Sequence, residues 1–428
     1  MSETVSPPLA RVLPWRDPLA AFSGFETERL SLLLHDGQSG RARIFARPDV
    51  VVSGETGSAF ASFAERFRQM DKGLWAGLFG YDLAGAFERL PRLDPAWPVL
   101  AMAHYPVWAE LDRDASEIRV HGEPGEAVEA FIETLCRSYR ALPLPGEKAS
   151  WSANWARDVY LDAARRARDY VHAGDVFQVN LSQRFTSELA SGDHPYAVFE
   201  RLCAASPAPH AAYLRLSDDE VVLTNSPERF ISVREGQVES RPIKGTRPRL
   251  DDPEADAKMH RELAVSRKDQ AENLMIVDLM RNDLSRVCEP GSVAVPRLCE
   301  VESFANVHHL VSDVTGRLRS DCDLVDLMQA SFPPGSITGA PKVRAMEIIS
   351  ELEGEARGPY CGALGWMTPD GEMDLNVMIR TASLRRQDDR WSAEIRSGGG
   401  VVADSDPDAE YEETLAKASA LKAAMGAS

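Results

Sequence analysis

Hydrophobic and polar residues alternate in some parts of the chain and recur every three to four residues in others. Short alternating or apolar runs, typical of β-strands, follow one another between residues 176 and 233, and the short loops between them favour antiparallel pairing. Residues 252–287 contain no proline after Pro253 and predict one or two long helices, and residues 409–425 predict another. Strands and helices that occur in separate blocks indicate an α+β fold.

Glycine and proline mark the ends of further predicted elements. Residues 73–91 contain short apolar stretches separated by glycine, which predict a strand followed by a helix. Residues 155–172 have helical spacing, and Gly174 stands where a glycine commonly ends a helix. Residues 141–155 carry several prolines and a glycine, so we expect the internal break of the chain there.

The composition narrows the class of protein. The 428 residues are 44% hydrophobic and 27% charged, as in ordinary globular proteins. A net charge of −18 argues against general nucleic-acid binding, which depends on clustered Lys and Arg. The six cysteines have no CxxC spacing, so neither a zinc site nor a disulfide framework is indicated. The start has no apolar leader and no run reaches roughly 18 apolar residues, so we expect a cytoplasmic protein without a membrane span.

One short segment gathers positive charge in this acidic chain. Residues 241–249, RPIKGTRPR, place Lys244 between Ile243 and Gly245 and surround it with three arginines. Three interpretations are open for this segment: a solvated turn, a patch that binds a polyanion, or a lysine positioned for chemistry. The overall negative charge weakens the second, although a small anionic substrate remains compatible with it.

Two predicted helices each carry a pair of carboxylates three residues apart. Asp269 and Glu272 form one pair and Glu410 and Glu413 the other, so each pair shares a helix face. The pairs are either solvated acidic faces or the two halves of a magnesium site. In the second case one carboxylate from each helix, together with waters and substrate oxygens, would complete an octahedron.

Two glycine-rich segments and a histidine pair are further candidates. Residues 331–342 and 394–407 each follow a strand-like run, and we expect loops that form either tight turns or carboxylate-binding backbone. Neither has the spacing of a phosphate loop or of a dinucleotide-binding motif. His308 and His309 lie side by side in a predicted strand, where neighbours face opposite ways, so at most one of them faces a site.

These segments together resemble the chorismate-utilising enzymes, which include the anthranilate, aminodeoxychorismate, isochorismate and salicylate synthases. The similarity runs in order from about residue 155 to 422 and extends more weakly to GLFGYD and ARIFARP. The matching stretches are GDVFQVN, SPERF, PIKGTRPR, ENLMIVDLMRNDLSRVCEPGSV, HHLVSDVTGRL, FPPGSITGAPKVRAMEIISELE, YCGALGW, IRTA and GGGVVADSDPDAEYEETLAKA.

The resemblance implies both a fold and a reaction class. The fold is one large α+β domain of the anthranilate synthase component I type, in which two mainly antiparallel sheets pack together between helical layers. Residues 1–150 would form part of this sandwich, and residues 151–428 would form the chorismate-binding catalytic region. The reaction would be a Mg²⁺-dependent attack on chorismate with loss of its allylic hydroxyl.

The resemblance also assigns roles residue by residue. Glu272 and Glu413 correspond to magnesium ligands, and Asp269 and Glu410 to acids that orient the metal's waters. Glu228 corresponds to the general acid for the C4 hydroxyl. His309 is a third catalytic candidate, but the matching position in anthranilate synthases is tied to pyruvate elimination, so packing or substrate positioning is its expected role here. The substrate-binding candidates are Gln178, Thr246, Gly335, Ser336, Thr338, Gly339, Tyr360, Arg380, Gly398, Gly399, Gly400 and Lys417.

Lys244 separates the subfamilies. Anthranilate synthases typically carry alanine at this position, whereas one large group of aminodeoxychorismate synthases reads PIKGT. The resemblance therefore implies that Lys244 attacks C2 of chorismate as the C4 hydroxyl leaves, and that ammonia then displaces the lysine to give 4-amino-4-deoxychorismate, on the route to p-aminobenzoate and folate. Such a lysine must be neutral, and Arg241, Arg247 and Mg²⁺ would lower its pKa if they point inward. We expect Glu228 to be protonated at that stage.

Alternatives and partners complete the interpretation. Anthranilate synthesis, or service to both pathways, is the first alternative, and a basic docking surface on an inactive relative is a weaker one. The chain shows neither a glutaminase segment nor a lyase domain, so we expect a separate glutamine amidotransferase subunit to supply ammonia in a heterodimer. Residues 32–37, LLLHDG, replace the element with which anthranilate synthases bind feedback tryptophan. We therefore expect no tryptophan inhibition, and structural binding of tryptophan stays open.

Overall fold

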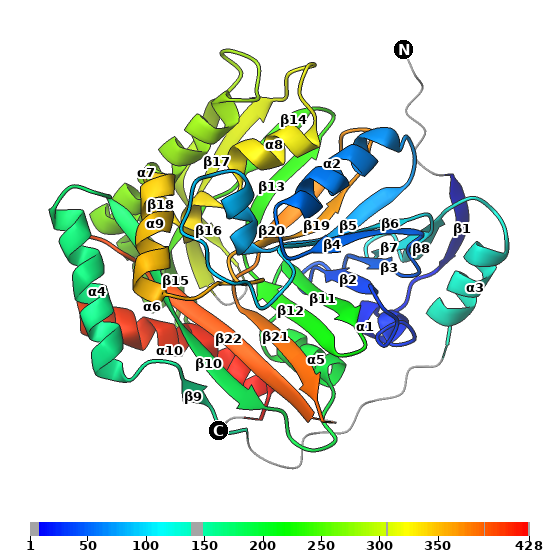
Figure 1. The fold of residues 1–428 in the computed structure, drawn as a ribbon, viewed down its shortest axis with the longest axis horizontal. Coiled ribbons are helices and arrows are strands. Elements are labelled where there is room, and N and C mark those ends of the chain that lie inside the picture. The colour runs from blue at the N-terminus through cyan, green and yellow to red at the C-terminus, as the bar shows by residue number, and fades with distance from the viewer. Residues whose placement is uncertain (1–7, 138–148, 305–306, 389, 427–428) are drawn as a thin grey trace.

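Two antiparallel sheets, packed face to face, run through the protein in a computed structural model that describes residues 8–137, 149–304, 307–388 and 390–426 (Figure 1). One sheet has twelve strands and the other ten. Segments from both sides of residue 150 contribute strands to each sheet, because β1 to β8 divide between the two. The residues of the expected break that fall in 141–148 lie outside the described residues.

The twelve-stranded sheet extends from the N-terminal strand to the strands that border the candidate site. Its order is β1 (Leu9–Pro14), β8 (Glu117–His121), β7 (Trp108–Asp112), β3 (Ala42–Phe45), β2 (Leu32–His35), β11 (His210–Ser217), β12 (Glu220–Ser226), β21 (Thr381–Gln387), β22 (Arg390–Val401), β10 (Gln178–Glu188) and β18 (Gly339–Ala340), with β9 (Ser152–Ala153) paired to β10.

The ten-stranded sheet begins at the strand that carries Lys244. Its order is β15 (Ile243–Pro248), β17 (Val307–Arg317), β14 (Gln237–Ser240), β13 (Arg229–Arg234), β20 (Met373–Val377), β19 (Ala363–Met367), β5 (Leu74–Phe79), β6 (Leu100–Tyr105) and β4 (Val50–Gly54), with β16 (Ala294–Ser303) paired to β17.

Helices cover the outer faces of both sheets. They are α1 (Pro18–Phe22), α2 (Ser58–Gln69), α3 (Glu126–Leu135), α4 (Arg157–His172), α5 (Pro195–Ala205), α6 (Pro253–Ala264), α7 (Arg267–Ser285), α8 (Leu324–Ser331), α9 (Lys342–Glu353) and α10 (Pro407–Ala424), with two 3₁₀ turns, η1 (Tyr81–Ala86) and η2 (Gly335–Ile337). None of these helices is long and apolar enough to cross a membrane.

Four apolar clusters define the layers. One lies between the sheets and contains Phe45, Leu78 and Leu214. A second packs α2, α7 and α8 on the ten-stranded sheet, and a third packs α1, α3, α5 and α10 on the twelve-stranded sheet. The fourth joins α4 and α9 to β10 and β22. Burial of alternate faces therefore produces the helix–sheet–sheet–helix order expected for this fold.

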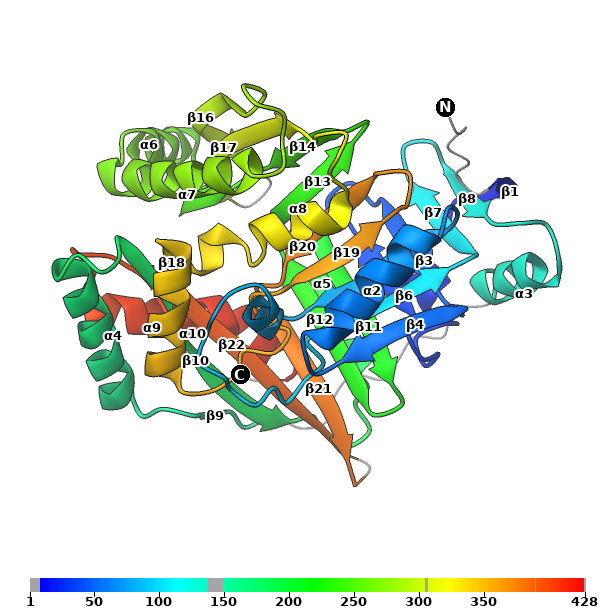
Figure 2. The same ribbon diagram turned by 45° about the horizontal axis from the view of Figure 1, so that its top comes forward.

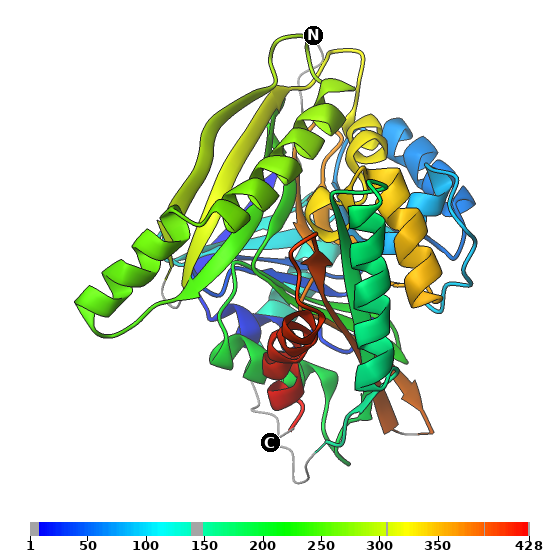
Figure 3. The same ribbon diagram turned by 90° about the vertical axis from the view of Figure 1, so that its left-hand side faces the viewer.

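The helices near the candidate site form two groups. In Figure 2, α6 and α7 lie with β16 and β17 on one side, and α9 and α10 lie on the other. Figure 3 shows α4 in teal and α9 in gold running alongside each other, with α10 in red next to α4. One helix of each group, α7 and α10, carries a pair of the predicted acidic residues.

Most of the predicted elements are present, with two exceptions. Residues 252–287 form two helices that break at Val265, and the Ser266 hydroxyl accepts from the Asp269 amide to begin the second. The helix predicted within 73–91 is wrong: β5 is followed by the short 3₁₀ turn η1. The ten residues between Gly80 and Pro91 are too few for a stable α-helix, and Gly85 in their middle lowers the helix propensity further.

The second exception concerns the glycine triplet at 398–400. We expected a loop, but the triplet continues β22 and pairs with residues 180–182 of β10. An added Cβ on Gly398 would lie 2.3 Å from the Leu181 carbonyl oxygen. The glycines therefore allow two strands to approach closely, and this requirement can be seen only once the register is known.

Candidate active site

Lys244 projects from an irregular strand at the edge of the ten-stranded sheet. The pairing of β15 with β17 shifts register between Lys244 and Thr246, and Gly245, between them, has φ = +79°. An added Cβ on Gly245 would lie 2.8 Å from both Asp269 Cγ and Leu263 Cδ1. Only glycine fits this bulge, and bulges redirect the side chains beside them. Local backbone geometry therefore aims the lysine.

The Lys244 ammonium lies against the η2 turn. Its Nζ atom donates to the Ser336 carbonyl oxygen at 3.1 Å. The Ser336 hydroxyl hydrogen-bonds to the carboxyl group of Glu228, which is 7% exposed. The structure thus brings together the predicted nucleophile, the predicted general acid and one residue of the predicted substrate loop.

Burial shifts both titrating groups towards their neutral forms. It lowers the pKa of Lys244, and the positive charge of Lys417 acts in the same direction, against the opposing effect of Glu228 and Glu272. Burial raises the pKa of Glu228, although the Ser336 hydroxyl and the charges of Lys244 and Lys417 oppose the shift. A neutral amine can attack an electrophile and a protonated carboxyl can donate a proton.

The neighbouring arginines do not create this environment, contrary to our expectation. Arg241 bonds to Asp313 at 3.0 Å and to Glu302 at 2.6 Å, and Arg247 pairs with Asp269 at 3.0 Å. Each guanidinium is neutralised by its own carboxylate partner. The cation whose charge lowers the pKa of Lys244 is instead Lys417, from α10, far along the chain.

The two acidic helix faces meet near the lysine. Repulsion by Asp269 and Glu413 adds to the burial that raises the pKa of Glu272, so charges from α7 and α10 act on one another. Burial also raises the pKa of Glu410, which accepts from Ser405 Oγ at 2.7 Å. A cation between the helices would relieve this repulsion.

These acids fit an open magnesium site better than a closed protein cage. No group of three or more His, Cys, Asp or Glu side chains in the described ranges is arranged to hold a metal ion. Magnesium is usually bound through one or two carboxylates plus waters and substrate oxygens. Glu272 and Glu413 match that requirement, whereas Asp269 is engaged by Arg247. The Glu413 carboxylate contacts Lys417 Nζ at 2.6 Å, so a metal would compete with that contact.

Arg380 is positioned to receive an anion. It lies where the chain passes from β20 to β21, with φ = +51°, and its side chain is half-buried. None of the described residues forms an ion pair or a hydrogen bond with its guanidinium. A half-buried cation without a partner, in a strained backbone conformation, is characteristic of a binding site. Tyr360 is buried near this segment, and burial raises its pKa, so its hydroxyl stays protonated.

Gln178 is a second unsatisfied group. Its side chain is fully buried, and neither its amide oxygen nor its amide nitrogen has a hydrogen-bond partner within the described part of the chain. The amide lies over Gly400, where an added Cβ would be 2.7 Å from Gln178 Cδ. Buried polar groups are nearly always paired, so this amide is available to a ligand.

The remaining substrate-binding candidates divide by their contacts. The Gly398 carbonyl oxygen accepts from Lys417 Nζ at 3.0 Å. The pairing of β22 with β21 ends at Ile395, so among the described strands none pairs with Gly398 on that side. Gly399 lies beside the carboxylates of Glu410 and Glu413. The backbone of this triplet can therefore meet a ligand on one edge while it pairs with β10 on the other.

The loop that contains Gly335, Thr338 and Gly339 is held mostly by internal packing. The Thr338 hydroxyl donates to the carbonyl oxygens of Pro334 and Gly335, both at 3.2 Å. Gly335 packs on Leu279, and an added Cβ on Gly339 would lie 2.1 Å from the Gln178 carbonyl oxygen. Within this loop it is Ser336 that contacts Lys244 and Glu228.

The two histidines face different partners, as the strand period predicts. His308 bonds to Ser303 and to Asp256, away from Lys244. His309 Nδ1 bonds to Thr246 Oγ1 at 2.9 Å, and burial lowers the pKa of His309 to about 4. His309 is therefore neutral at physiological pH. Its hydrogen-bond partner Thr246 lies at the bulge that sets the direction of the Lys244 side chain.

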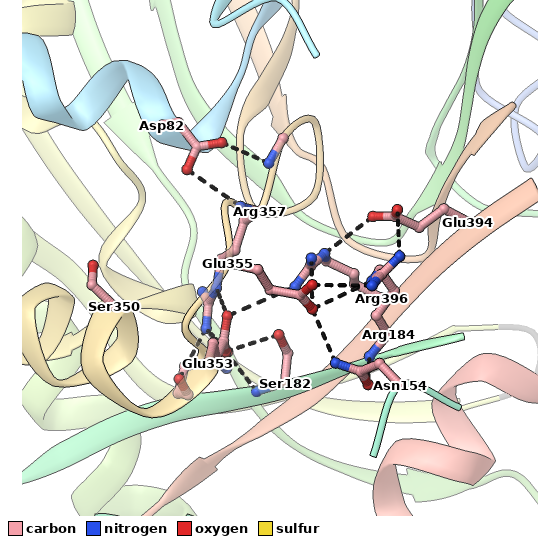
Figure 4. Close-up of polar contacts among 12 residues, drawn as sticks. Asp82, Asn154, Ser182, Arg184, Ser350, Glu353, Glu355, Arg357, Glu394 and Arg396 are labelled. Atoms are coloured by element: carbon pink, nitrogen blue, oxygen red, sulfur yellow. Dashed lines mark hydrogen bonds and ion pairs between the residues drawn. The ribbon is translucent and has the colours of Figure 1, made fainter. Parts of the chain in front are cut away.

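Sequence reasoning missed the buried ion pair beneath the site. Arg357 and Glu353 are almost fully buried and bond through two contacts of 2.9 and 2.6 Å (Figure 4). The residues are four apart, but Gly354 ends α9 between them with φ = +67°, so no helical pattern signals the pair. The run ARGPY, with an arginine before a glycine in an apolar context, is the available hint.

A separate cavity lies between the two sheets. Its volume is about 560 Å³, and its walls include His35 and Asp36 from the LLLHDG segment. The guanidinium of Arg43 lies 3.7 Å from the centre of the Trp366 ring within this region. Ile243 reaches the cavity wall while its neighbour Lys244 meets η2, because successive residues of a strand face opposite ways.

Comparisons with known proteins place this geometry in a family. Residues 30–423 match the chorismate binding enzymes. Aminodeoxychorismate synthase component 1 of Klebsiella aerogenes is 47% identical over 347 residues, which cover 80% of this chain and 74% of that protein. The Escherichia coli K12 protein of the same name is 45% identical over 351 residues, with the same coverage.

A solved structure agrees with the sequence relatives. The crystal structure of anthranilate synthase component I from Streptococcus pneumoniae has a TM-score of 0.75 and 27% identity, and the match covers 99% of this chain and 94% of that one. Its fold matches the two packed antiparallel sheets described above. The chain therefore belongs to the family of chorismate binding enzymes.

Proposed function

We propose that the protein aminates chorismate at C4 to give 4-amino-4-deoxychorismate, with Lys244 as the attacking nucleophile. The observation that carries this proposal is the juxtaposition of Lys244, with its lowered pKa, and the buried acid Glu228 on either side of Ser336. The names of the relatives that are 45 to 47% identical support the same activity.

The reaction consists of two allylic displacements. The neutral Nζ of Lys244 forms a bond to C2, the two conjugated ring double bonds shift to C1–C6 and C5–C4, and the C4–oxygen bond breaks. Glu228 gives its proton to the departing hydroxyl, which leaves as water. Ammonia then bonds to C4, both double bonds return, and the C2–nitrogen bond breaks to release the lysine as a neutral amine, while the added nitrogen gives its extra proton to the Glu228 carboxylate. The carbon skeleton and the enolpyruvyl group are unchanged.

Substrate binding would fall to groups that keep unused bonding capacity in the protein. Arg380 offers an unpaired cation for one carboxylate of the substrate, and the Gln178 amide and the open edge of Gly398 and Gly400 offer hydrogen bonds. Glu272 and Glu413 would hold Mg²⁺, which when bound supplies positive charge for substrate oxygens and for a departing hydroxyl. A separate glutamine amidotransferase subunit would supply the ammonia.

A product assay tests the proposed function directly. The purified chain is incubated with chorismate, Mg²⁺ and ammonium in alkaline buffer, and the products are separated with and without added aminodeoxychorismate lyase. We expect p-aminobenzoate only when the lyase is present. Anthranilate formed without the lyase would instead assign the chain to tryptophan synthesis, and no chorismate turnover would favour the inactive docking relative.

Replacement of Lys244 by alanine removes the proposed nucleophile. We expect C4 amination to fall by at least about a hundredfold, because covalent catalysis is lost. Direct attack of ammonia at C2 would then yield an anthranilate-type product. Arg249→Ala is the matched control, since Arg249 belongs to the same basic segment but pairs with Asp256 away from the lysine.

The control separates two interpretations of the basic segment. A docking surface would suffer from the loss of Arg249 as much as from the loss of Lys244. Full retention of C4 amination by Lys244→Ala would show that Lys244 is an ordinary strand residue without a catalytic role.

Replacement of either proposed metal ligand should change the response to magnesium. Glu272→Gln and Glu413→Gln each remove one negative charge, so we expect a higher Mg²⁺ concentration for half-maximal activity and a lower maximal rate. Glu412→Gln, at the exposed position of α10 next to Glu413, serves as the control. Unchanged magnesium titrations in both variants would remove the assignment.

The pH dependence of C4 amination should be bell-shaped. The rate rises with pH as Lys244 loses its proton, and it falls at higher pH as Glu228 loses the proton that it must donate. Burial moves the two pKa values towards each other, so the optimum is narrow. We expect Glu228→Gln to lose most of the activity, and a profile that still falls on the alkaline side in residual activity would contradict the role of Glu228.

A further inference from the structure

Arg357 makes an unusual set of bonds for a residue outside the reacting groups. Its side chain is completely buried, and it donates to both carboxylate oxygens of Glu353. Its Nη1 also donates to the Ile337 carbonyl oxygen at 3.1 Å, and its Nη2 donates to the Asn180 carbonyl oxygen at 3.0 Å. Figure 4 shows this side chain within the polar network around Glu353.

The two backbone carbonyls belong to the segments that present site residues. Ile337 follows Ser336, whose carbonyl accepts from Lys244 and whose hydroxyl bonds to Glu228. Asn180 lies two residues after Gln178, whose amide has no partner among the described residues. The guanidinium therefore ties η2 to the start of β10, in addition to the backbone bonds that join residues 338–340 to residues 177–180.

The geometry requires arginine and not merely a positive charge. The planar fork of a guanidinium can bond to a carboxylate and to carbonyl oxygens in several directions at once, whereas a lysine ammonium is a compact charge on a flexible stem. Arg357 is further confined by the rings of Tyr81 and Tyr360, whose centres lie 4.8 and 5.8 Å from its guanidinium carbon. The guanidinium in turn packs against one side of the Tyr360 ring.

We propose that Arg357 is a positioning residue for the reaction: by bonding to the Ile337 and Asn180 carbonyls it holds Ser336 where that residue meets both Lys244 and Glu228. This inference rests on the proposed function, in which Lys244 is the nucleophile. Displacements of about 1 Å at a reacting group can lower a rate about a hundredfold, so a residue that never touches the substrate can control turnover.

A second arginine of the same network provides a matched control. Arg396 is 4% exposed and its nitrogens lie close to Glu355 and Glu394, at 3.0 and 3.2 Å. Arg396 also lies 4.0 Å from Glu353, and among the described residues its guanidinium contacts acidic side chains and neither η2 nor the start of β10. Arg357→Lys and Arg396→Lys therefore make the same chemical change in the same buried network, and only the first removes side-chain bonds to the site segments.

The test compares kcat, KM for chorismate and the denaturation midpoint of both variants. We expect Arg357→Lys to lower kcat about a hundredfold, with a smaller rise in KM, because Gln178 lies on one of the held segments whereas Arg380 lies on neither. We expect Arg396→Lys to keep kcat within about threefold at a comparable loss of stability. Equal losses of kcat in the two variants would show a purely structural role and overturn the proposal.

A second readout does not depend on turnover. The rate at which an amine-reactive reagent labels Lys244 is followed by mass spectrometry of the peptide that contains it. We expect faster labelling in Arg357→Lys than in Arg396→Lys, because a loosened η2 exposes the amine. Identical labelling in both would overturn the inference. If the wild-type protein does not aminate chorismate, the proposed function fails, and the labelling comparison still decides whether Arg357 controls the surroundings of Lys244.

If Arg357→Lys does not fold, Glu353→Gln provides the same test with a smaller change. It removes the charge that orients the guanidinium, while the side chain can still accept from Ser182. We expect the same direction of change in kcat and in labelling, with Arg396→Lys again as the comparison. Wild-type values in Glu353→Gln would contradict the proposal.

Discussion

The buried ion pair of Arg357 and Glu353 is the interaction on which the arrangement of the site depends. Transfer of a charged side chain from water to the protein interior costs several kcal/mol per ion. The attraction between the two ions offsets this cost only when their remaining donors and acceptors are also hydrogen-bonded. Here they are: Arg357 bonds to two backbone carbonyls, and Glu353 accepts from the Ser182 amide and hydroxyl. The pair is thus stable only while α9, η2 and β10 keep their relative positions, so it specifies that arrangement.

Above this pair, the balance between burial and attraction decides the chemistry of Lys244. A lysine and a glutamate in one site would ordinarily form an ion pair, with each charge stabilising the other. In this site burial outweighs the attraction for both residues, and Lys417 opposes the charge on Lys244. In the proposed reaction the amine attacks in its neutral form, and the protonated acid gives its proton to the hydroxyl, which leaves as water. The same low polarity that makes the pair costly as ions suits these two proposed roles.

How much of this could be predicted from the sequence differed from residue to residue. The acidic faces of α7 and α10 followed from spacing alone, because residues three apart on a helix share a face. The family resemblance supplied the fold and the site residues, Lys244 among them. The direction of Arg241 and Arg247 could not be read, since it depends on acids that approach from other elements, such as Asp313 and Asp269.

Two further features escaped prediction because they depend on register and on tertiary contacts. The triplet at 398–400 resembles a loop in sequence but needs glycine to lie against β10. Arg357 follows the end of α9, and its carbonyl partners lie 20 and 177 residues away along the chain. No local pattern records such partners, so an arginine of this kind is recognised only from the folded structure.

The position of the site explains why so many separate segments contribute to it. Glu228 lies where the chain passes from β12 of one sheet to β13 of the other, and Arg380 lies where it returns from β20 to β21. The two crossings are bonded to each other, since Val377 donates to the Glu228 carbonyl and Asn225 donates to the Arg380 carbonyl, both at 3.0 Å. Lys244 comes from the edge of the ten-stranded sheet and Gly398 from the twelve-stranded sheet. The proposed nucleophile from one sheet and the proposed substrate-binding edge from the other meet at this junction, where the crossing strands fix the sheets to each other and the Lys342–Asp283 ion pair joins α9 to α7.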